Sequence, residues 1–310
     1  YGVSITNTVD SFIVNQLGGP EISRYILAPL CVGLMTLALA FGNAIMLKIA
    51  QFVVYPLIVA LAAVSLYLIP QWDLGSFLEA GDHSAGGVLK AIILILPVLV
   101  FSFSFVAAIS QFSLGMEKEY GADHHAQSDK VIRNSAILLT IFTMFFVWSC
   151  ALAMGADGMQ EANDKNLPVL SYFANETGTQ FMAYMAPIVV ICAVASSYFG
   201  HALGTIEGTQ YLFNLGAPKA TKKMSTRTLD LWTYLFIFVS TSLVGIFNPS
   251  ILDMISVVGG VFFAFMTYLL PIWVIYRVEA LARFRGNKTN FFVAIMGLIV
   301  LFATIWGMFQ

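Results

Sequence analysis

The feature that most constrains this chain is a series of apolar runs, each long enough to cross a lipid bilayer. A membrane helix needs about 20 mostly apolar residues at a rise of about 1.5 Å each. Hydrophobic residues make up 59% of the chain and charged residues only 10%, which is far from the composition of a soluble domain. The sequence therefore predicts an all-α, polytopic helical membrane protein, since membrane-barrel strands would be short and strictly alternating.

The apolar runs predict about nine membrane spans in one transmembrane domain that covers residues 1–310. The expected spans are 1–18, 24–46, 49–69, 88–114, 134–154, 181–206, 228–247, 251–276 and 290–309. We expect the first span to be incomplete, because Tyr1 already lies in what looks like the later part of a membrane helix.

Positive charge predicts the orientation of these spans. Of the 15 Lys and Arg residues, all but three fall in one set of alternate connections. That set lies at Lys48, 116–133, 219–227 and 277–288, and the three exceptions are Arg24, Lys90 and Lys165. Because cytoplasmic loops are enriched in Lys and Arg, we expect the larger set in the cytoplasm and the C-terminus outside. The near-neutral net charge of −2 argues against nucleic acid as a partner.

One apolar run, 88–115, contains Pro97 and then serines interleaved with phenylalanines. A proline removes one backbone hydrogen bond, and in hydrocarbon such a defect is tolerated where it is buried in protein or lines a watery cavity. We predict a broken helix around 101–104, at a binding site near the membrane midplane. The alternative is a plain proline kink whose serines bond back to their own helix.

Asp10 is the acidic residue that the sequence places well inside a span. A carboxylate there costs ~2.5–3.5 kcal/mol on insertion scales, so it is expected to face the interior of the bundle. Thr6 and Asn7 lie one helical turn away on the same side. Asp10 is a candidate proton-binding or cation-pairing group, and the alternative is a structural carboxylate paired with a residue that precedes the chain.

The run 181–208 ends in the motif AVASSYFGHALGTIEG, which presents two polar or small faces. Small residues spaced by four predict close helix packing, and they are Ser196, Gly200, Gly204 and Gly208. Ser197 and His201 form a second pair one turn apart. Hydroxyls can complete an oxygen shell for a small cation, and a histidine can relay protons. The alternatives are serines bonded within their own helix and a histidine with a structural partner.

The sequence contains no phosphate-binding glycine loop, nucleophile elbow or metalloprotease helix. The three cysteines all fall in apolar runs, so neither a disulfide framework nor a metal site is indicated. We therefore expect no catalytic residues and no cofactor other than a coupling ion. A membrane-embedded enzyme would need several ionisable groups at one depth, and a channel or sensor without active coupling is the other alternative.

Four segments, LPVLVFSFSF, IFTMFFVWSCALAMG, LPVLSYFAN and AVASSYFGHALGTIEG, resemble the hydroxy and aromatic amino acid permeases of bacteria, nearest the serine/threonine branch. The resemblance extends over essentially the whole chain. It implies a LeuT-like inverted-repeat bundle that here lacks its first two spans, with 88–115 as the discontinuous sixth span. It also implies an inner-membrane location, which would make the expected outside end of the chain periplasmic.

The resemblance further implies proton-coupled symport of a small neutral amino acid into the cytoplasm by alternating access. By position, Phe101, Ser102, Phe103 and Ser104 would contact the substrate. Ser196 and Ser197 match the hydroxyl pair that closes a sodium site in sodium-coupled relatives, so sodium coupling stays an alternative. Asp10 and His201 are the protonatable candidates, with Asp10 preferred. Residues 105–108 depart from the pattern of this branch, so the identity of the transported amino acid stays open. The oligomeric state is also open.

Overall fold

The computed structural model describes residues 1–40, 43–79, 83–176 and 179–309, and these residues fold into helices and their connections. Within them, 6 stretches are helical and apolar enough to span a membrane, which confirms the predicted all-α polytopic class. They are Gln51–Gln71, Ala85–Asp164, Gln180–Gly216, Thr226–Phe247, Ile251–Arg277 and Thr289–Gly307. Ala85–Asp164 contains two expected spans, and the total of about nine spans in one domain stays a prediction.

Contacts divide the chain into two compact units. Unit 1 is Tyr1–Glu79 with Ser110–Pro249, and unit 2 is Ala80–Ile109 with Ser250–Gln310. The first turn of α6 (Val106–Tyr120) therefore belongs to unit 2 and the remainder of that helix to unit 1.

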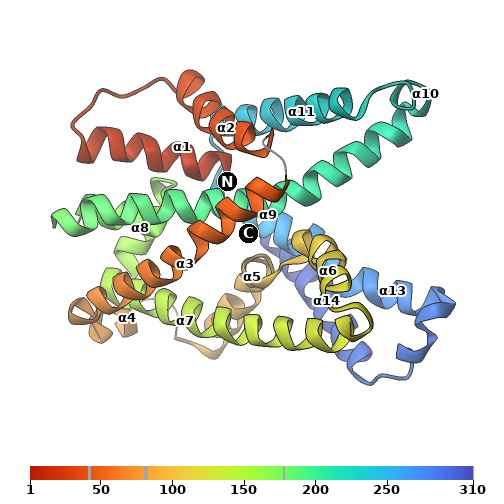
Figure 1. The fold of residues 1–310 in the computed structure, drawn as a ribbon. Helices are drawn as coiled ribbons and strands as arrows, with labels where there is room; N and C mark the ends of the chain where they lie inside the picture. The colour runs from red at the N-terminus through yellow and green to blue at the C-terminus, as the bar shows by residue number, and fades with distance from the viewer. Residues whose placement is uncertain (41–42, 80–82, 177–178, 310) are drawn as a thin grey trace. The chain divides into compact units, whose positions relative to one another are not determined.

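Unit 1 is organised around one long helix, α9 (Gln180–Gly216), which contacts most of the other helices of the unit (Figure 1). These other elements are α1 (Gly2–Ser11), the π-helical η1 (Phe12–Gln16), α2 (Arg24–Ala40), α3 (Asn43–Leu68), η2 (Ile69–Gln71), α4 (Leu74–Glu79), η3 (Gly121–Asp123), α7 (His124–Asp164), α8 (Val169–Glu176), α10 (Pro218–Thr221) and α11 (Thr226–Phe247). Buried apolar side chains from α1, α2, α3, α8 and α9 form one continuous core.

Helix α1 runs antiparallel to α9. The Tyr1 ring lies 5.2 Å from the His201 ring, and further along the pair Phe12 lies 6.2 Å from Tyr184. The first expected span, 1–18, ends close to its predicted boundary, because η1 stops at Gln16 and Gly18 adopts φ +63°. Glycine takes this left-handed conformation without steric cost.

Unit 2 is built on α5 (Ala85–Phe103), which packs against a helix with two π-helical segments. Its other elements are α12 (Ile251–Val257), η4 (Val258–Phe263), η5 (Phe265–Leu269), α13 (Leu270–Arg277), η6 (Glu279–Phe284) and α14 (Thr289–Gly307). Val100, Ala264 and Val300, from α5, the π-helical stretch and α14, form its buried core.

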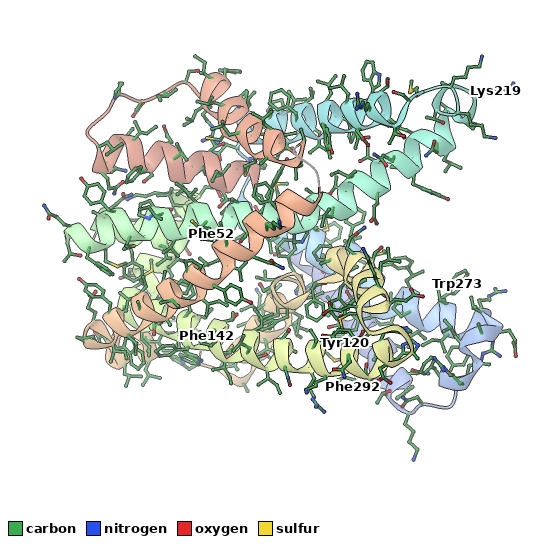
Figure 2. All side chains as sticks on the ribbon, in the orientation of Figure 1. Phe52, Tyr120, Phe142, Lys219, Trp273 and Phe292 are labelled. Carbon is green, nitrogen blue, oxygen red and sulfur yellow. The ribbon has the colours of Figure 1, made fainter. Side chains whose placement is uncertain are left out.

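Large apolar side chains cover the outside of both units. Phe52 on α3 is 80% exposed and Phe292 on α14 is 64% exposed, and both are labelled in Figure 2. A soluble protein rarely leaves so many aromatic and aliphatic side chains uncovered. In a bilayer the lipid tails cover them, so this surface agrees with the membrane class.

Two expected connections are helical. The turn expected at Lys48 is wrong, because α2 ends at Ala40 and α3 begins at Asn43, so that Lys48 lies inside α3; residues 41–42 fall outside the described residues. The charged loop expected at 116–133 is also wrong. Alpha-helical residues continue into it from both sides, and the direction changes at η3, where Gly121 adopts φ +52°.

Other boundaries follow the sequence signals. A short helix, α8, forms between the expected spans 134–154 and 181–206. Asn248 ends α11 in the left-handed conformation, and Ser250 caps α12 by accepting from the Asp253 amide at 3.2 Å. Ser84 caps α5 in the same way, accepting from the Gly87 amide at 3.0 Å. Such caps satisfy amides that the first helical turn leaves without a partner.

Two glycines of α9, Gly200 and Gly208, lack the close packing that the sequence predicted for them. A Cβ built on Gly200 or Gly208 meets no atom of the described residues within 4 Å. The close packing lies instead at Gly259 and Gly260 of η4. A Cβ on Gly259 would collide with the Pro97 carbonyl oxygen and lie 2.8 Å from the Phe101 Cβ, and one on Gly260 would collide with Thr304.

We predict that Gly259→Ala destabilises the protein by ~1–3 kcal/mol, because the added methyl group must push α5 away from η4. Gly200→Ala is the matched control, since its methyl group enters open space and alanine favours the helix by ~1 kcal/mol. Thermal unfolding in detergent measures both. Equal melting temperatures for the two variants would contradict the packing described here.

Candidate functional site

The predicted break in the span at 88–115 is present. Helix α5 continues through Pro97 and ends at Phe103, and α6 begins at Val106. Ser104 has extended backbone angles (φ −90°, ψ 130°). The last turn of a helix leaves carbonyls, and the first turn of the next leaves amides, without helical partners. The interruption therefore places both kinds of backbone group side by side in the sequence, inside an apolar span.

A small cavity of about 220 Å³ lies beside the break, entirely within unit 2. Phe103 and Ser104 line it from α5 and the break. The other lining residues are Leu96, Leu99, Val100, Thr267, Tyr268, Met296 and Val300. The lining is mostly apolar, with hydroxyl groups from Ser104, Thr267 and Tyr268.

The other two candidate residues of this span have structural contacts. Phe101 stacks on Phe263 of η4, with ring centroids 5.3 Å apart and an interplanar angle of 18°. The Ser102 hydroxyl donates to the Val98 carbonyl at 2.8 Å, which is the alternative that the sequence left open. Ser104 accepts a long contact of 3.5 Å from the Val106 amide. Of the four candidates, Phe103 and Ser104 face the cavity.

Asp10 lies in unit 1, on the wall of a polar pocket of about 910 Å³. Residues from the end of α1, from η1, from the start of α2 and from α8 line the pocket. The start of α9 and the end of α11 complete its wall. Asp10 interacts electrostatically with Arg24 and with Glu21. Thr6 and Asn7 were expected on the same side of the helix as Asp10, but only Asn7 lines the pocket with it. Thr6 is fully buried and donates to the Gly2 carbonyl at 2.7 Å.

A hydrogen-bond network that the sequence did not predict lies next to Asp10. Arg24 donates to Asn7 Oδ1 at 2.7 Å and to the Gly245 carbonyl at 2.8 Å. Asn7 donates in turn to the Asn166 carbonyl at 2.7 Å and to Asn248 Oδ1 at 3.1 Å, and Asn166 Nδ2 donates to Asn248 Oδ1 at 3.0 Å. The network joins α1, α2 and α11 to the segment that follows α7.

Both asparagines at the outer corners of this network adopt positive φ, 52° at Asn166 and 50° at Asn248. Asparagine tolerates the left-handed region better than most residues. The sequence signal that could have found them is weak, since Asn248 precedes Pro249 and reads only as a turn.

The three candidates of α9 are held mainly by local bonds. The Ser196 hydroxyl donates to the Ala193 carbonyl at 3.0 Å. His201 Nδ1 lies 2.9 Å from the Ser197 carbonyl and 3.3 Å from the Tyr1 hydroxyl, which also bonds to Ser197. These contacts match the structural alternatives for Ser196 and His201.

The structure does not bring Asp10 together with His201. Tyr1 contacts His201, and Asp10 lies nine residues further along α1, which is about 14 Å of helix. Within unit 1 the candidates thus fall at two separate depths, and Phe103 and Ser104 belong to unit 2.

A second carboxylate was missed because the expected span stopped at residue 206. Glu207 lies on α9, which continues to Gly216, and it accepts hydrogen bonds from Gln111 and, at 3.5 Å, from Ser110 of α6. One turn further on, Gln210 donates to Asp230 Oδ1 of α11 at 2.8 Å. Among the described residues, no group of three or more His, Cys, Asp or Glu side chains is arranged to hold a metal ion.

Helix α8 is held within unit 1 by a cluster in which its buried Tyr172 meets the half-exposed side chains of Glu161 and Lys165. The Tyr172 hydroxyl donates to Glu161 Oε2 at 2.6 Å, and Lys165 Nζ lies 2.6 Å from Glu161 Oε1. This hydrogen bond to a carboxylate, together with burial, raises the pKa of Tyr172 to about 12. Ser171 donates to Thr8 at 3.1 Å on the buried side, so α8 is held from both faces.

We predict that Asn248→Ala destabilises the protein more than Asn248→Gly. Both variants lose the side-chain bonds to Asn7 and Asn166, at about 1 kcal/mol each, but alanine also pays ~1–2 kcal/mol for the left-handed backbone. Melting temperatures in detergent should therefore fall in the order wild type, glycine, alanine. An alanine variant as stable as the glycine variant would show that position 248 is not held left-handed.

We predict that Tyr172 stays protonated well above pH 10. Because its folded-state pKa of about 12 exceeds the ordinary value of 10.0, the stability it adds is complete below pH 10 and is lost as pH rises toward 12. The tyrosinate absorbance of the protein minus that of Tyr172→Phe should therefore rise near pH 12. A difference signal centred at pH 10 would show that the bond to Glu161 does not form.

Comparison with known proteins agrees with this architecture. The family model described as transmembrane amino acid transporter protein matches residues 22–310. The serine transporter SdaC of Escherichia coli strain K12 is 35% identical over 100% of this chain and 73% of its own length. The threonine/serine transporter TdcC of Yersinia enterocolitica is 36% identical over 99% of this chain and 74% of its own. TdcC of Edwardsiella tarda is 32% identical over the same shares.

No solved structure matches the chain. The family match covers most of the chain, and the relatives named are transporters rather than enzymes. The chain therefore belongs to the transmembrane amino acid transporter family, on the branch that contains serine and threonine/serine transporters, as the sequence resemblance predicted.

Proposed function

We propose that the protein imports serine or threonine into a bacterial cytoplasm together with protons, by alternating access in the inner membrane. The names of its relatives support the substrate class. The distribution of Lys and Arg supports the orientation with the C-terminus in the periplasm. Arg24 and Lys165, both expected outside, line the same polar pocket of unit 1, which supports their lying on one side of the membrane.

The observation that carries the proposal is the break at Ser104 and Phe105. The carboxyl end of α5 bears partial negative charge and attracts an ammonium group, and the amino end of α6 bears partial positive charge and attracts a carboxylate. An α-amino acid carries both groups one carbon apart. A broken membrane helix thus offers complementary charge to every amino acid backbone, without a buried charged side chain.

Asp10 is our preferred coupling group. It lies in a polar pocket that water can fill, so a proton can reach it from one side of the membrane, and it is next to the network that joins four segments of unit 1. His201 is the second candidate. Sodium coupling through Ser196 and Ser197 has less support, because the Ser196 hydroxyl already bonds to its own helix.

Uptake by the purified protein in proteoliposomes tests the proposal. Labelled L-serine should accumulate against its gradient when the interior is made alkaline, and a protonophore should abolish the accumulation. Accumulation driven by a sodium gradient at equal pH would show that sodium, and not the proton, is the coupling ion. Downhill flux that no ion gradient can concentrate would indicate a channel and overturn the proposal.

We predict that Asp10→Asn abolishes accumulation driven by the pH gradient while serine exchange across the membrane at equal pH continues. The substitution keeps the size of the side chain but removes its titration, so binding and alternation persist without coupling. Asp230→Asn is the matched control, because Asp230 bonds to Gln210 away from the pocket. Unchanged gradient-driven accumulation in Asp10→Asn would exclude Asp10 as the coupling group.

A further inference from the structure

We propose that the hairpin formed by the end of α9, by α10 and by the start of α11 binds an acidic phospholipid of the surrounding membrane. An acyl chain of the lipid enters an apolar cavity of the hairpin, and the lysines of α10 hold its phosphate. The ligand is a lipid rather than the transported amino acid, so the inference goes beyond the proposed function. All of the residues that carry it belong to unit 1.

The first argument is the cavity, which has a volume of about 290 Å³ and lies where α9, α10 and α11 meet. The polar side chain of its wall is Thr221, whose hydroxyl donates to the Ala217 carbonyl at 3.2 Å. Leu212 and Trp232 are more than half exposed, so the cavity opens to the outside of the hairpin. The large apolar side chains of the wall are Leu212, Phe213, Met224, Leu229 and Trp232.

The hairpin has a defined geometry. Figure 1 shows α9 and α11 meeting at α10, and Figure 2 labels Lys219 at the tip. Gln210 of α9 donates to Asp230 Oδ1 of α11 at 2.8 Å. The rings of Phe213 and Phe236 meet edge to face, with centroids 6.1 Å apart. Backbone hydrogen bonds close α10 itself, so the cavity and the lysines stay next to each other.

The second argument is the charge of the hairpin. Its basic residues, all of them exposed, are Lys219, Lys222, Lys223 and Arg227. None of the four forms an ion pair with an acidic side chain of the described chain. Residues 208–229 contain no Asp or Glu at all. Such a cluster beside a membrane surface attracts acidic headgroups.

The basic segment 277–288 of unit 2 shows that this charge is not simply repeated elsewhere. There Arg285 pairs with Glu279 at 3.3 Å. Arg277 lies over the Trp273 ring at 5.8 Å, and Arg283 lies over a phenylalanine ring at 4.7 Å. The enrichment of Lys and Arg in cytoplasmic connections accounts for both clusters. It does not account for lysines without partners beside an open apolar cavity.

The cavity and the cations together indicate the class of ligand. A soluble anion satisfies the lysines and leaves the apolar wall uncovered. A lipid with no net charge fills the cavity and leaves the lysines without a partner. An acidic phospholipid meets both requirements, because its phosphate and its acyl chain belong to one molecule.

Quenching of Trp232 fluorescence by brominated lipids tests the inference, because the indole lines the cavity. Of the five tryptophans only Trp232 is kept, and the others are replaced by phenylalanine. The protein is placed in bilayers that contain phosphatidylglycerol or phosphatidylcholine with brominated acyl chains. We expect the acidic lipid to bind beside Trp232 about tenfold more tightly at low salt, and salt to weaken this preference.

Neutralising α10 tests the role of its lysines. Replacing all three, by Lys219→Gln, Lys222→Gln and Lys223→Gln, should abolish the preference for phosphatidylglycerol, while three arginines at these positions should keep it. The matched control removes the same charge from unit 2, by Arg277→Gln, Arg283→Gln and Lys288→Gln, and should leave the preference at Trp232 unchanged. A preference that survives neutralisation of α10 overturns the inference.

Gly216→Leu tests the cavity. Gly216 lines it, and a Cβ built there meets no described atom within 4 Å, so the leucine side chain can fill the space. Quenching by both lipids should fall severalfold. Gly208→Leu is the matched control, because Gly208 also has open space around its Cβ but does not line the cavity. An equal fall in both variants, or in neither, contradicts an acyl chain in the cavity.

The remaining outcomes also decide. Equal quenching by the two lipids in wild type would show a lipid-covered surface without charge recognition. Quenching by neither would show that protein, such as a second copy of the chain, covers the cavity. Displacement of the lipid by soluble glycerol phosphate would show a phosphate site without an acyl chain. Each result overturns the inference, as does a wild-type preference that about 1 M salt leaves unchanged, which decides even if the glutamine variant does not fold.

Discussion

The requirement that every backbone amide and carbonyl in hydrocarbon be hydrogen-bonded governs this protein. An uninterrupted helix meets it, and an interruption meets it only where protein, water or a ligand supplies the partners. The chain nevertheless stops α5 at Phe103 and starts α6 at Val106 within one apolar span. The break leaves backbone amides and carbonyls without helical partners, which costs free energy in hydrocarbon. Binding of a zwitterionic amino acid would offset this cost, because it supplies partners of both signs.

The surroundings of the break support it by close packing rather than by charged side chains. Gly259 lets η4 approach α5 at Pro97 and Phe101, and Gly260 lets it approach Thr304 of α14. The stacked rings of Phe101 and Phe263 lie one turn before the break. Unit 1 is held differently. There the amides of Asn7, Asn166 and Asn248 and the guanidinium of Arg24 tie separate helices together beside a polar pocket. The break in unit 2 is thus surrounded by close packing, and the polar pocket of unit 1 is bordered by directional hydrogen bonds in addition to the apolar core of that unit.

The sequence predicted those features that follow from local chemistry. Apolar length predicted the helices, Pro97 and the Ser-Phe alternation predicted an interrupted span, and the Asn248-Pro249 turn was expected. It could not separate Ser102 from Ser104, because rotation about the helix axis near its end decides which hydroxyl bonds back to the helix. Nor could it predict that 251–276 contains π-helical segments, since their hydrogen-bond register depends on tertiary packing against α5 and α14. The asparagine network joins residues more than 150 positions apart, beyond any local signal.

The most direct test of the central claim is a cysteine scan of residues 98–108 in lipid, after replacement of Cys31, Cys150 and Cys192, with a small water-soluble thiol reagent. If the broken backbone receives the amino acid, cysteines at 103 to 105 react fastest in the scan, and L-serine protects them while a large charged amino acid does not. Uniformly slow labelling along the segment, or fast labelling at 104 that L-serine leaves unchanged, would show that the break does not bind the substrate.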